Sequence, residues 1–411
     1  MSPAPTRLAW LDALRGPAAL AVTAHHAGWS FVPAVWAVVD RRIDLGTWGV
    51  FVFFLVSGYI IPASLERRGD LRAFWTGRAF RLLPLLLAAL GLAFLLGLAG
   101  LLPLDPRLGE RPAPLVALGN LTMLQELLNL PPVIGVTWTL SYEMAFYLIS
   151  VGLFATGQAH RSAGIAVSLA ALAVPAGLLL PGASINGGAD LVAALLALAV
   201  VAAIAVTVLG RGRARTAAAV AGGLLGLALV VLGSRAGTWQ GVIILAAMFA
   251  GTAVHRAEQG TISWRTAGLA ALAVLACGIP AKDDPGWAPA LVLAFAVFGL
   301  GLALRHRAFP RVLTRLGVIS FSVYLLHPLL LRPLPNLPLY YVVLIPLCLV
   351  TYHVVEAPAQ RLGRRLIASR TPLPEVGTDA AGGHPPAPAR ASGAASGSRS
   401  RRWPPSSGDH E

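Results

Sequence analysis

Apolar runs of about twenty residues recur along most of this chain, and each is long enough to cross the roughly 30 Å hydrocarbon core of a bilayer as an α-helix. Of the 411 residues, 56% are hydrophobic and only 12% are charged, whereas soluble domains carry about 25% charged residues. A surface that faces water cannot be built from so few ionic groups. Only helices and closed barrels satisfy their backbone groups in lipid, and the runs lack the alternation of barrel strands. We therefore expect an all-α, polytopic transmembrane helix bundle with about ten to twelve spans.

Twelve segments have the length and composition of a span. They cover residues 8–29, 46–65, 79–102, 134–156, 164–181, 189–209, 217–233, 239–255, 266–281, 287–304, 316–331 and 337–356. A further apolar stretch, 115–130, lies between Pro114 and Pro131 and contains Glu126. We expect this stretch to be interfacial or re-entrant.

The loop charges predict the orientation of the bundle. If the N-terminus is cytoplasmic, the cytoplasmic loops between these spans carry fifteen Arg residues, and the loops on the other side carry seven Arg or Lys residues. Cytoplasmic loops are normally the basic ones, so we expect a multi-pass protein of the inner or plasma membrane with both termini in the cytoplasm. The net charge of +14 is explained by this topology, and we expect the lipid bilayer and no nucleic acid as a partner.

The end of the chain has a different composition. From about residue 370 it is rich in Pro, Gly, Ala, Ser and Arg and has almost no large apolar residues, and such a composition buries too little surface to fold. We therefore expect a transmembrane domain at 1–366 and a disordered cytoplasmic tail at 367–411.

The first span carries an arginine and a histidine that are eleven residues apart, Arg15 and His26. At about 100° per residue this separation returns to nearly the same helix face, with an axial rise of about 16 Å. That length is comparable to an extended pantetheine arm, so Arg15 could hold a phosphate while His26 meets a thioester. The alternative is a snorkelling Arg15 and a His26 that only packs. The neighbouring His25 points about 100° away and is the weaker candidate.

Two arginines at the start of the third span, Arg78 and Arg81, form an RxxR pair. Residues at i and i+3 share a helix face, so both guanidiniums can bind one polyanion, and arginine suits bidentate phosphate contacts. The alternative is that both are ordinary arginines of a basic cytoplasmic loop.

The fourth span contains one deep carboxylate, Glu143, in TWTLSYEMAFYL at 137–148. An acid in mid-membrane costs about 2.5 kcal/mol or more, so Glu143 must face the bundle. A histidine partner would orient an imidazole and stabilise its charged form. A structural bond to an arginine or a tyrosine is an equal alternative.

Six segments, in this order along residues 7 to 366, resemble the acyltransferase-3 family of membrane-bound O-acyltransferases. They are LDALRGPAALAVTAHH at 11–26, VFFLVSGYII at 52–61, RAFR at 78–81, WTLSYEMAFYLI at 138–149, LGVISFSVYLLHPLL at 316–330 and VEAP at 355–358. The family's Arg/Lys-x10-His motif falls on Arg15 and His26, and its RxxR motif falls on Arg78 and Arg81.

The resemblance implies an acyl-CoA donor, acetyl-CoA being the common one, and acylation of hydroxyls on surface polysaccharides, lipopolysaccharide or antibiotic sugars. With it we expect acyl-CoA as a co-substrate, a carbohydrate or glycoside acceptor, no permanently bound cofactor and no metal ion. His26 is then the candidate general base, with His327 as the second candidate at a similar depth, and Glu143 orients or charge-balances the base. The second span would add the hydroxyls of Ser57 and Tyr59 to the pocket, with Gly58 allowing close backbone approach.

Two other functions fit parts of this pattern. About twelve spans with buried His and Glu residues would suit a proton-coupled secondary transporter, but the two halves show no evident internal symmetry. A non-catalytic scaffold would gain nothing from costly buried groups such as His26 and Glu143. An O-acyltransferase therefore remains the leading hypothesis.

Overall fold

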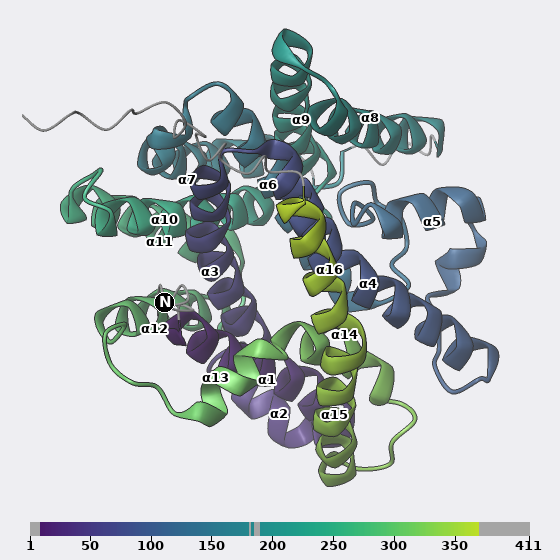
Figure 1. The fold of residues 1–411 in the computed structure, drawn as a ribbon. Helices are drawn as coiled ribbons and strands as arrows, with labels where there is room; N and C mark the ends of the chain where they lie inside the picture. The colour runs from purple at the N-terminus through teal and green to yellow at the C-terminus, as the bar shows by residue number, and fades with distance from the viewer. Residues whose placement is uncertain (1–8, 181, 185–189, 370–411) are drawn as a thin grey trace, which may run out of the picture. The chain divides into compact units, whose positions relative to one another are not determined.

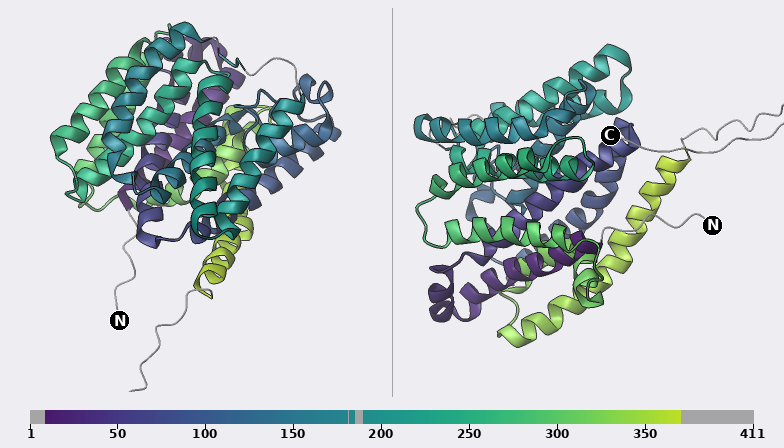
Figure 2. Two further views of the ribbon diagram at one scale, coloured as in Figure 1. Left: turned by 90° about the horizontal axis from the view of Figure 1, so that it is seen from above. Right: turned by 90° about the vertical axis from the view of Figure 1, so that its left-hand side faces the viewer.

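The computed structural model describes residues 9–180, 182–184 and 190–369, and within these ranges every regular element is helical (Figure 1). The α-helices are α1 (Ala9–Phe31), α2 (Pro33–Asp40), α3 (Leu45–Arg68), α4 (Leu71–Leu98), α5 (Ala113–Leu121), α6 (Trp138–Ala155), α7 (Ser162–Leu179), α8 (Asp190–Leu209), α9 (Gly212–Gly233), α10 (Thr238–Glu258), α11 (Trp264–Gly278), α12 (Trp287–Ala303), α13 (Arg311–Val318), α14 (Ser320–Leu330), α15 (Leu337–Thr351) and α16 (Ala357–Ala368). In both views of Figure 2 most of the long helices run side by side. The predicted tail, 367–411, lies from residue 370 onward outside the described residues.

Each of the twelve predicted segments falls on a helix, but one of them is broken. The segment 316–331 is divided between α13 and α14, which meet at an angle of 68°. The stretch 115–130 contains α5, which ends at Leu121, and its remainder is irregular with buried leucine side chains such as Leu124 and Leu127.

Eight of the described helical segments are long and apolar enough to cross a membrane, or nine if the bent α13–α14 pair counts as one span. The eight are Leu45–Arg68, Leu71–Leu98, Ala159–Leu179, Asp190–Leu209, Gly212–Gly233, Thr238–Glu258, Trp264–Ala281 and Leu337–Ala368. Neither α1 nor α6 belongs to this set. These two helices carry Arg15, His26 and Glu143, which lower their hydropathy.

The bundle has an interior and a periphery that differ in burial. In the apolar windows of α3 and α10, 72% and 78% of the residues are buried, against 22% in α8. Large apolar side chains of α8, among them Leu191, Leu195 and Leu198, are exposed. Because this surface is apolar, we interpret α8 as a lipid-facing helix and the α3–α10 pair as the centre of the bundle.

Glycines allow the central helices to cross at very short distance. A Cβ added to Gly58 of α3 would lie 1.8 Å from the carbonyl oxygen of Met248 in α10. A Cβ on Gly317 of α13 would lie 1.9 Å from the carbonyl oxygen of Asp12 in α1. Small residues at helix crossings are typical of membrane bundles, where packing drives association.

The last helix, α16, lies beside α4. Between α15 and α16 the chain makes a π-helical turn, η5 (Tyr352–Glu356), and α16 then packs along α4 (Figure 1). Such π-turns are frequent at functional sites. Here the turn places Glu356, which is only 4% exposed, inside the bundle.

Candidate active site

A cavity of about 1340 Å³ opens among α1, α3, α4, α6, α14 and α16. It is lined by the three arginines that the sequence singled out, Arg15, Arg78 and Arg81. The same cavity reaches Arg67, from the end of α3, and Arg361 and Arg364, from α16. The arginines of α1 and α4 are thus brought together in one cavity, whose lining also holds the carboxylates of Asp12, Glu66, Glu143, Glu258 and Glu356.

Arg78 is held against aromatic rings. Its guanidinium carbon lies 5.7 Å from the ring centre of Phe74 and 5.8 Å from that of Tyr147, which are cation–π distances. Its Nε is buried and makes no hydrogen bond to any described residue. Arg78 therefore offers a donor to an anionic ligand in the cavity.

Glu143 also lines the cavity, and its partners come from its own helix and from α3. Tyr147 donates a hydrogen bond of 2.6 Å to Glu143 Oε1, and Ser57 donates a longer one of 3.4 Å. The sequence left open a histidine partner or a bond to an arginine or a tyrosine, and the structure has the bond to tyrosine. The Glu143 carboxylate also interacts electrostatically with Arg15 and Arg81.

A second carboxylate faces the same arginines. Glu356 lines the cavity and accepts a hydrogen bond from Ser322 of α14. Its charge also acts on Arg15 and Arg81. Sequence reasoning placed Glu356 at the end of a span and assigned it no role, although it belongs to the VEAP segment.

The two candidate bases lie next to each other, and neither is among the residues that line the cavity. The rings of His26 and His327 are 5.0 Å apart, edge to face. His26 is partly exposed, whereas His327 is fully buried. The link to the cavity is Tyr324, which lines it and whose ring lies 6.1 Å from that of His327.

The hydrogen bonds of His26 and His327 show which ring nitrogen carries the hydrogen and which keeps the lone pair. His26 Nδ1 lies 3.0 Å from the carbonyl oxygen of Val22, and His327 Nδ1 lies 2.8 Å from that of Tyr324. A carbonyl can only accept, so in each ring Nδ1 carries the hydrogen and Nε2 keeps the lone pair. Each imidazole is therefore in the tautomer that lets Nε2 act as a base.

Comparison with known proteins identifies the family of the chain. A family model described as an acyltransferase domain, that of the acyltransferase-3 family, matches residues 8–352. The chain belongs to the acyltransferase-3 family. Neither the curated proteins nor the solved structures give a match. The matched range contains every helix that contributes Arg15, Arg78, Arg81, Glu143 or the histidine pair, so the polar centre belongs to the acyltransferase domain itself.

The second span contributes to this acyltransferase in two ways. Ser57 and Tyr59 line the cavity. Gly58 is not among the lining residues, and its carbonyl accepts a hydrogen bond of 2.7 Å from Thr252 of α10. Gly58 thus allows the close α3–α10 crossing, and the crossing in turn fixes the wall that carries the two hydroxyls.

Tyr59 leads to a polar network that sequence reasoning missed. Its hydroxyl donates to Glu258 of α10, which also pairs with Arg305 at 2.6 Å. Both His255 and Glu258 line the cavity. In the sequence Arg305 was counted only as a loop arginine, and no spacing signal connects it to Tyr59.

Proposed function

We propose that this membrane acyltransferase transfers an acyl group, acetyl in the simplest case, from acyl-CoA to a hydroxyl of a glycan, a surface polysaccharide or a glycosylated metabolite. The observation that carries the proposal is the convergence of Arg15, Arg78 and Arg81 on one cavity that reaches Tyr324, next to the His26–His327 pair. A cavity with arginines in its wall and an imidazole pair behind Tyr324 suits a donor with phosphates at one end and a thioester at the other.

The size of the cavity supports a large donor. Its volume of about 1340 Å³ exceeds the roughly 300–1000 Å³ of pockets for drug-sized ligands. The phosphates would lie among the arginines, and the reacting end would meet the histidines at Tyr324. Glu143 and Glu356 then balance the arginine charges, so that the cavity without a donor is not an uncompensated cluster of cations.

The proton transfers follow from the tautomer of His26. Its Nε2 takes the proton of the acceptor hydroxyl, and the oxygen attacks the thioester carbonyl. The tetrahedral intermediate collapses by breaking the carbon–sulfur bond, and the imidazolium returns the proton to the CoA thiolate. His26 is favoured over His327 because it is partly exposed and can reach an acceptor, whereas His327 is enclosed.

The proposal is tested with full-length protein in detergent, labelled acetyl-CoA and a panel of glycan acceptors, with the product measured by mass. Loss of a general base lowers turnover by about 10²–10⁴-fold, so His26→Ala should show a loss of this size. His353→Ala, at an exposed histidine whose Nδ1 bonds the Leu349 carbonyl, should leave turnover unchanged.

Two results would contradict the proposal. Full turnover in His26→Ala together with its loss in His327→Ala would transfer the role of base to His327. Movement of a substrate across proteoliposomes without CoA, with no acylated product, would favour the transporter.

A further inference from the structure

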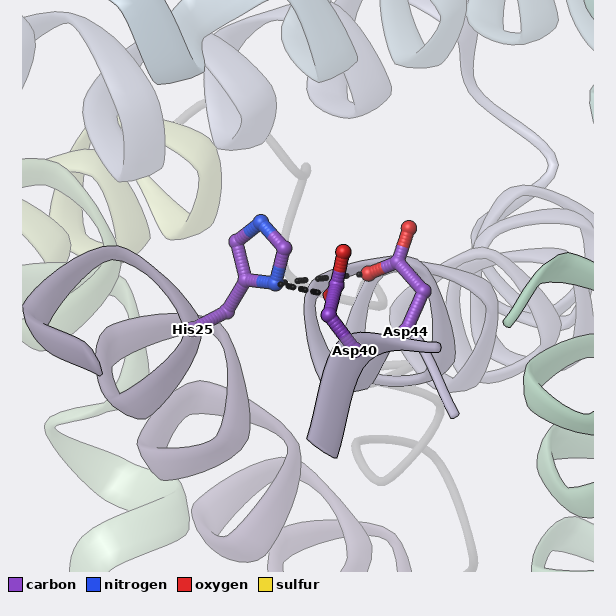
Figure 3. Close-up of side chains that lie close together, drawn as sticks. All are labelled: His25, Asp40 and Asp44. Atoms are coloured by element: carbon purple, nitrogen blue, oxygen red, sulfur yellow. Dashed lines mark ion pairs between the residues drawn. The ribbon is translucent and has the colours of Figure 1, made fainter. Parts of the chain in front are cut away.

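A separate polar cluster lies at the end of α1 opposite Arg15. His25 of α1, Asp40 at the end of α2 and Asp44 just before α3 direct their side chains toward one another (Figure 3). His25 Nδ1 is 3.3 Å from Asp40 Oδ1 and 3.5 Å from Asp44 Oδ1. One ligand atom from each residue lies within 4.8 Å of the other two. The cluster therefore joins one imidazole nitrogen and two carboxylates that come from three different elements.

The two nitrogen–oxygen distances of His25 are those expected between ligands of one metal ion. With metal–nitrogen and metal–oxygen distances near 2.0–2.2 Å, neighbouring ligand atoms lie about 3.0–3.5 Å apart in tetrahedral or octahedral sites. Both nitrogen–oxygen distances of His25 fall in or at the edge of this range. Imidazole and carboxylate together are a common ligand set for Zn²⁺.

A simple ion pair accounts less well for the atoms involved. His25 Nδ1 and Asp40 Oδ1 are both buried, and neither makes a hydrogen bond of acceptable geometry to any described residue. Buried polar atoms are usually paired. A cation placed between the two atoms would satisfy both of them at once.

The only lysine of the sequence, Lys282, is paired with another carboxylate. Lys282 Nζ lies 2.8 Å from Asp284 Oδ2 and 5.9 Å from the ring centre of Trp287. The hydrogen bond from Lys282 holds the pKa of Asp284 below its ordinary value. Because Lys282 is committed to Asp284, it does not directly neutralise the Asp40–Asp44 pair.

Asp44 is oriented by hydrogen bonds that leave it facing the cluster. Its Oδ1 accepts from the backbone N–H of Thr47 at 2.8 Å, and its Oδ2 accepts from the Thr47 hydroxyl at 2.6 Å. Its own N–H donates to the carbonyl of Gly286 at 3.1 Å. Partners of this kind fix metal-binding carboxylates, and their loss typically weakens metal affinity about 10–100-fold.

We propose that His25, Asp40 and Asp44 bind a divalent cation of the Zn²⁺ class, which clamps the adjoining ends of α1, α2 and α3. The family resemblance led us to expect no metal ion. Asp40 and Asp44 come near His25 only through the fold of the segment between α1 and α3, which contains α2. The imidazole of His25 lies 5.2 Å from that of His26, so the clamp holds the segment that carries the proposed base. The site stands on its own geometry, whether or not His26 is the base.

The test uses full-length protein in detergent, treated with chelator and then titrated with Zn²⁺ by calorimetry, with the thermal midpoint measured in parallel. The wild type should bind one Zn²⁺ at the His25–Asp40–Asp44 site, and its thermal midpoint should be higher with Zn²⁺ than without it. His25→Gln and Asp40→Asn should each weaken binding by more than about 100-fold, beyond the loss expected for an outer-shell partner. Thr47→Val keeps all three ligands and should weaken binding about 10–100-fold.

His160→Gln removes an exposed histidine that bonds the Gly157 carbonyl, and it should bind Zn²⁺ like the wild type. Equal affinity in the wild type, His25→Gln and Asp40→Asn would overturn the proposal, since binding would then be to other surface groups. A wild type whose thermal midpoint is the same with and without Zn²⁺ would also overturn it and leave His25 as an ion-pair partner.

Discussion

The close crossing of α3 and α10 makes Gly58→Ala a sharp test of how the cavity wall is held. The added Cβ would lie 1.8 Å from the Met248 carbonyl oxygen. A bare Cβ contact with backbone does not occur at this distance, so the two helices must separate. The contact is matched on the other helix, where a Cβ on Gly251 would lie 2.3 Å from the Leu55 carbonyl oxygen.

The expected cost has two parts. Overpacking a tight site costs about 1–3 kcal/mol, and separation of the helices also breaks the Thr252–Gly58 hydrogen bond, worth about 1 kcal/mol. With an unfolding entropy of about 0.8 kcal/mol/K for a chain of this size, the sum of about 2–4 kcal/mol should lower the thermal midpoint by about 3–5 °C. Because Ser57 and Tyr59 flank Gly58 and line the cavity, turnover should also fall, and a displacement of about 1 Å can cost about 10²-fold.

The assay measures the thermal midpoint and the acetyl-transfer rate of the same detergent preparations. Gly91→Ala is the matched control, since Gly91 lies inside α4 with nothing within 4 Å of an added Cβ. It should be neutral or slightly stabilising, because alanine favours a helix by about 0.5–1 kcal/mol over glycine. If Gly58→Ala keeps both the wild-type midpoint and the wild-type rate, the α3–α10 contact does not hold the wall and the reasoning fails.

Two further substitutions test the charged groups of the cavity. Tyr147→Phe removes the hydroxyl that donates to Glu143. Since hydrogen bonds to charged groups are worth about 1.5–3 kcal/mol, the thermal midpoint should fall. A fall of the same size in Tyr341→Phe, at a tyrosine that does not bond Glu143, would show that loss of a hydroxyl alone explains it. Arg81→Ala should raise KM for acyl-CoA by about 10–150-fold with a smaller change in kcat. The substitution Arg161→Ala, at an exposed arginine, should change neither constant. An unaltered KM in Arg81→Ala would show that Arg81 does not bind the donor phosphates.

The helices were predictable because their signal is local. Each apolar run has the length of a span, and helical backbone is obligatory in lipid for such a run. The break at Ile319 was not predictable in the same way. It divides a continuous apolar segment into α13 and α14 at 68°. Just before the break, Gly317 packs closely against the Asp12 carbonyl of α1, a contact that the local sequence does not reveal.

Part of the site was predictable for the same reason. Arg15 stood out as a charged group inside a span, which is costly and usually functional. Arg78 and Arg81 stood out as an i, i+3 pair that can bind one polyanion, and all three line one cavity. The sequence did not show that Glu143 bonds Tyr147, four residues along the same helix, because arginine, tyrosine and histidine were all chemically acceptable partners. It also did not distinguish Glu356 from an ordinary acid at the end of a span.

The sequence by itself determined that this chain is a helical membrane protein and which few polar residues must turn away from lipid. Both conclusions depend on the energy of a residue in hydrocarbon, which is a property of the residue and its immediate neighbours along the chain. Only the tertiary structure decided which polar groups meet: His26 with His327, Ser322 with Glu356, and His25 with the two aspartates. These groups come from different helices, and their geometry is set by close crossings and bent segments that no local periodicity encodes.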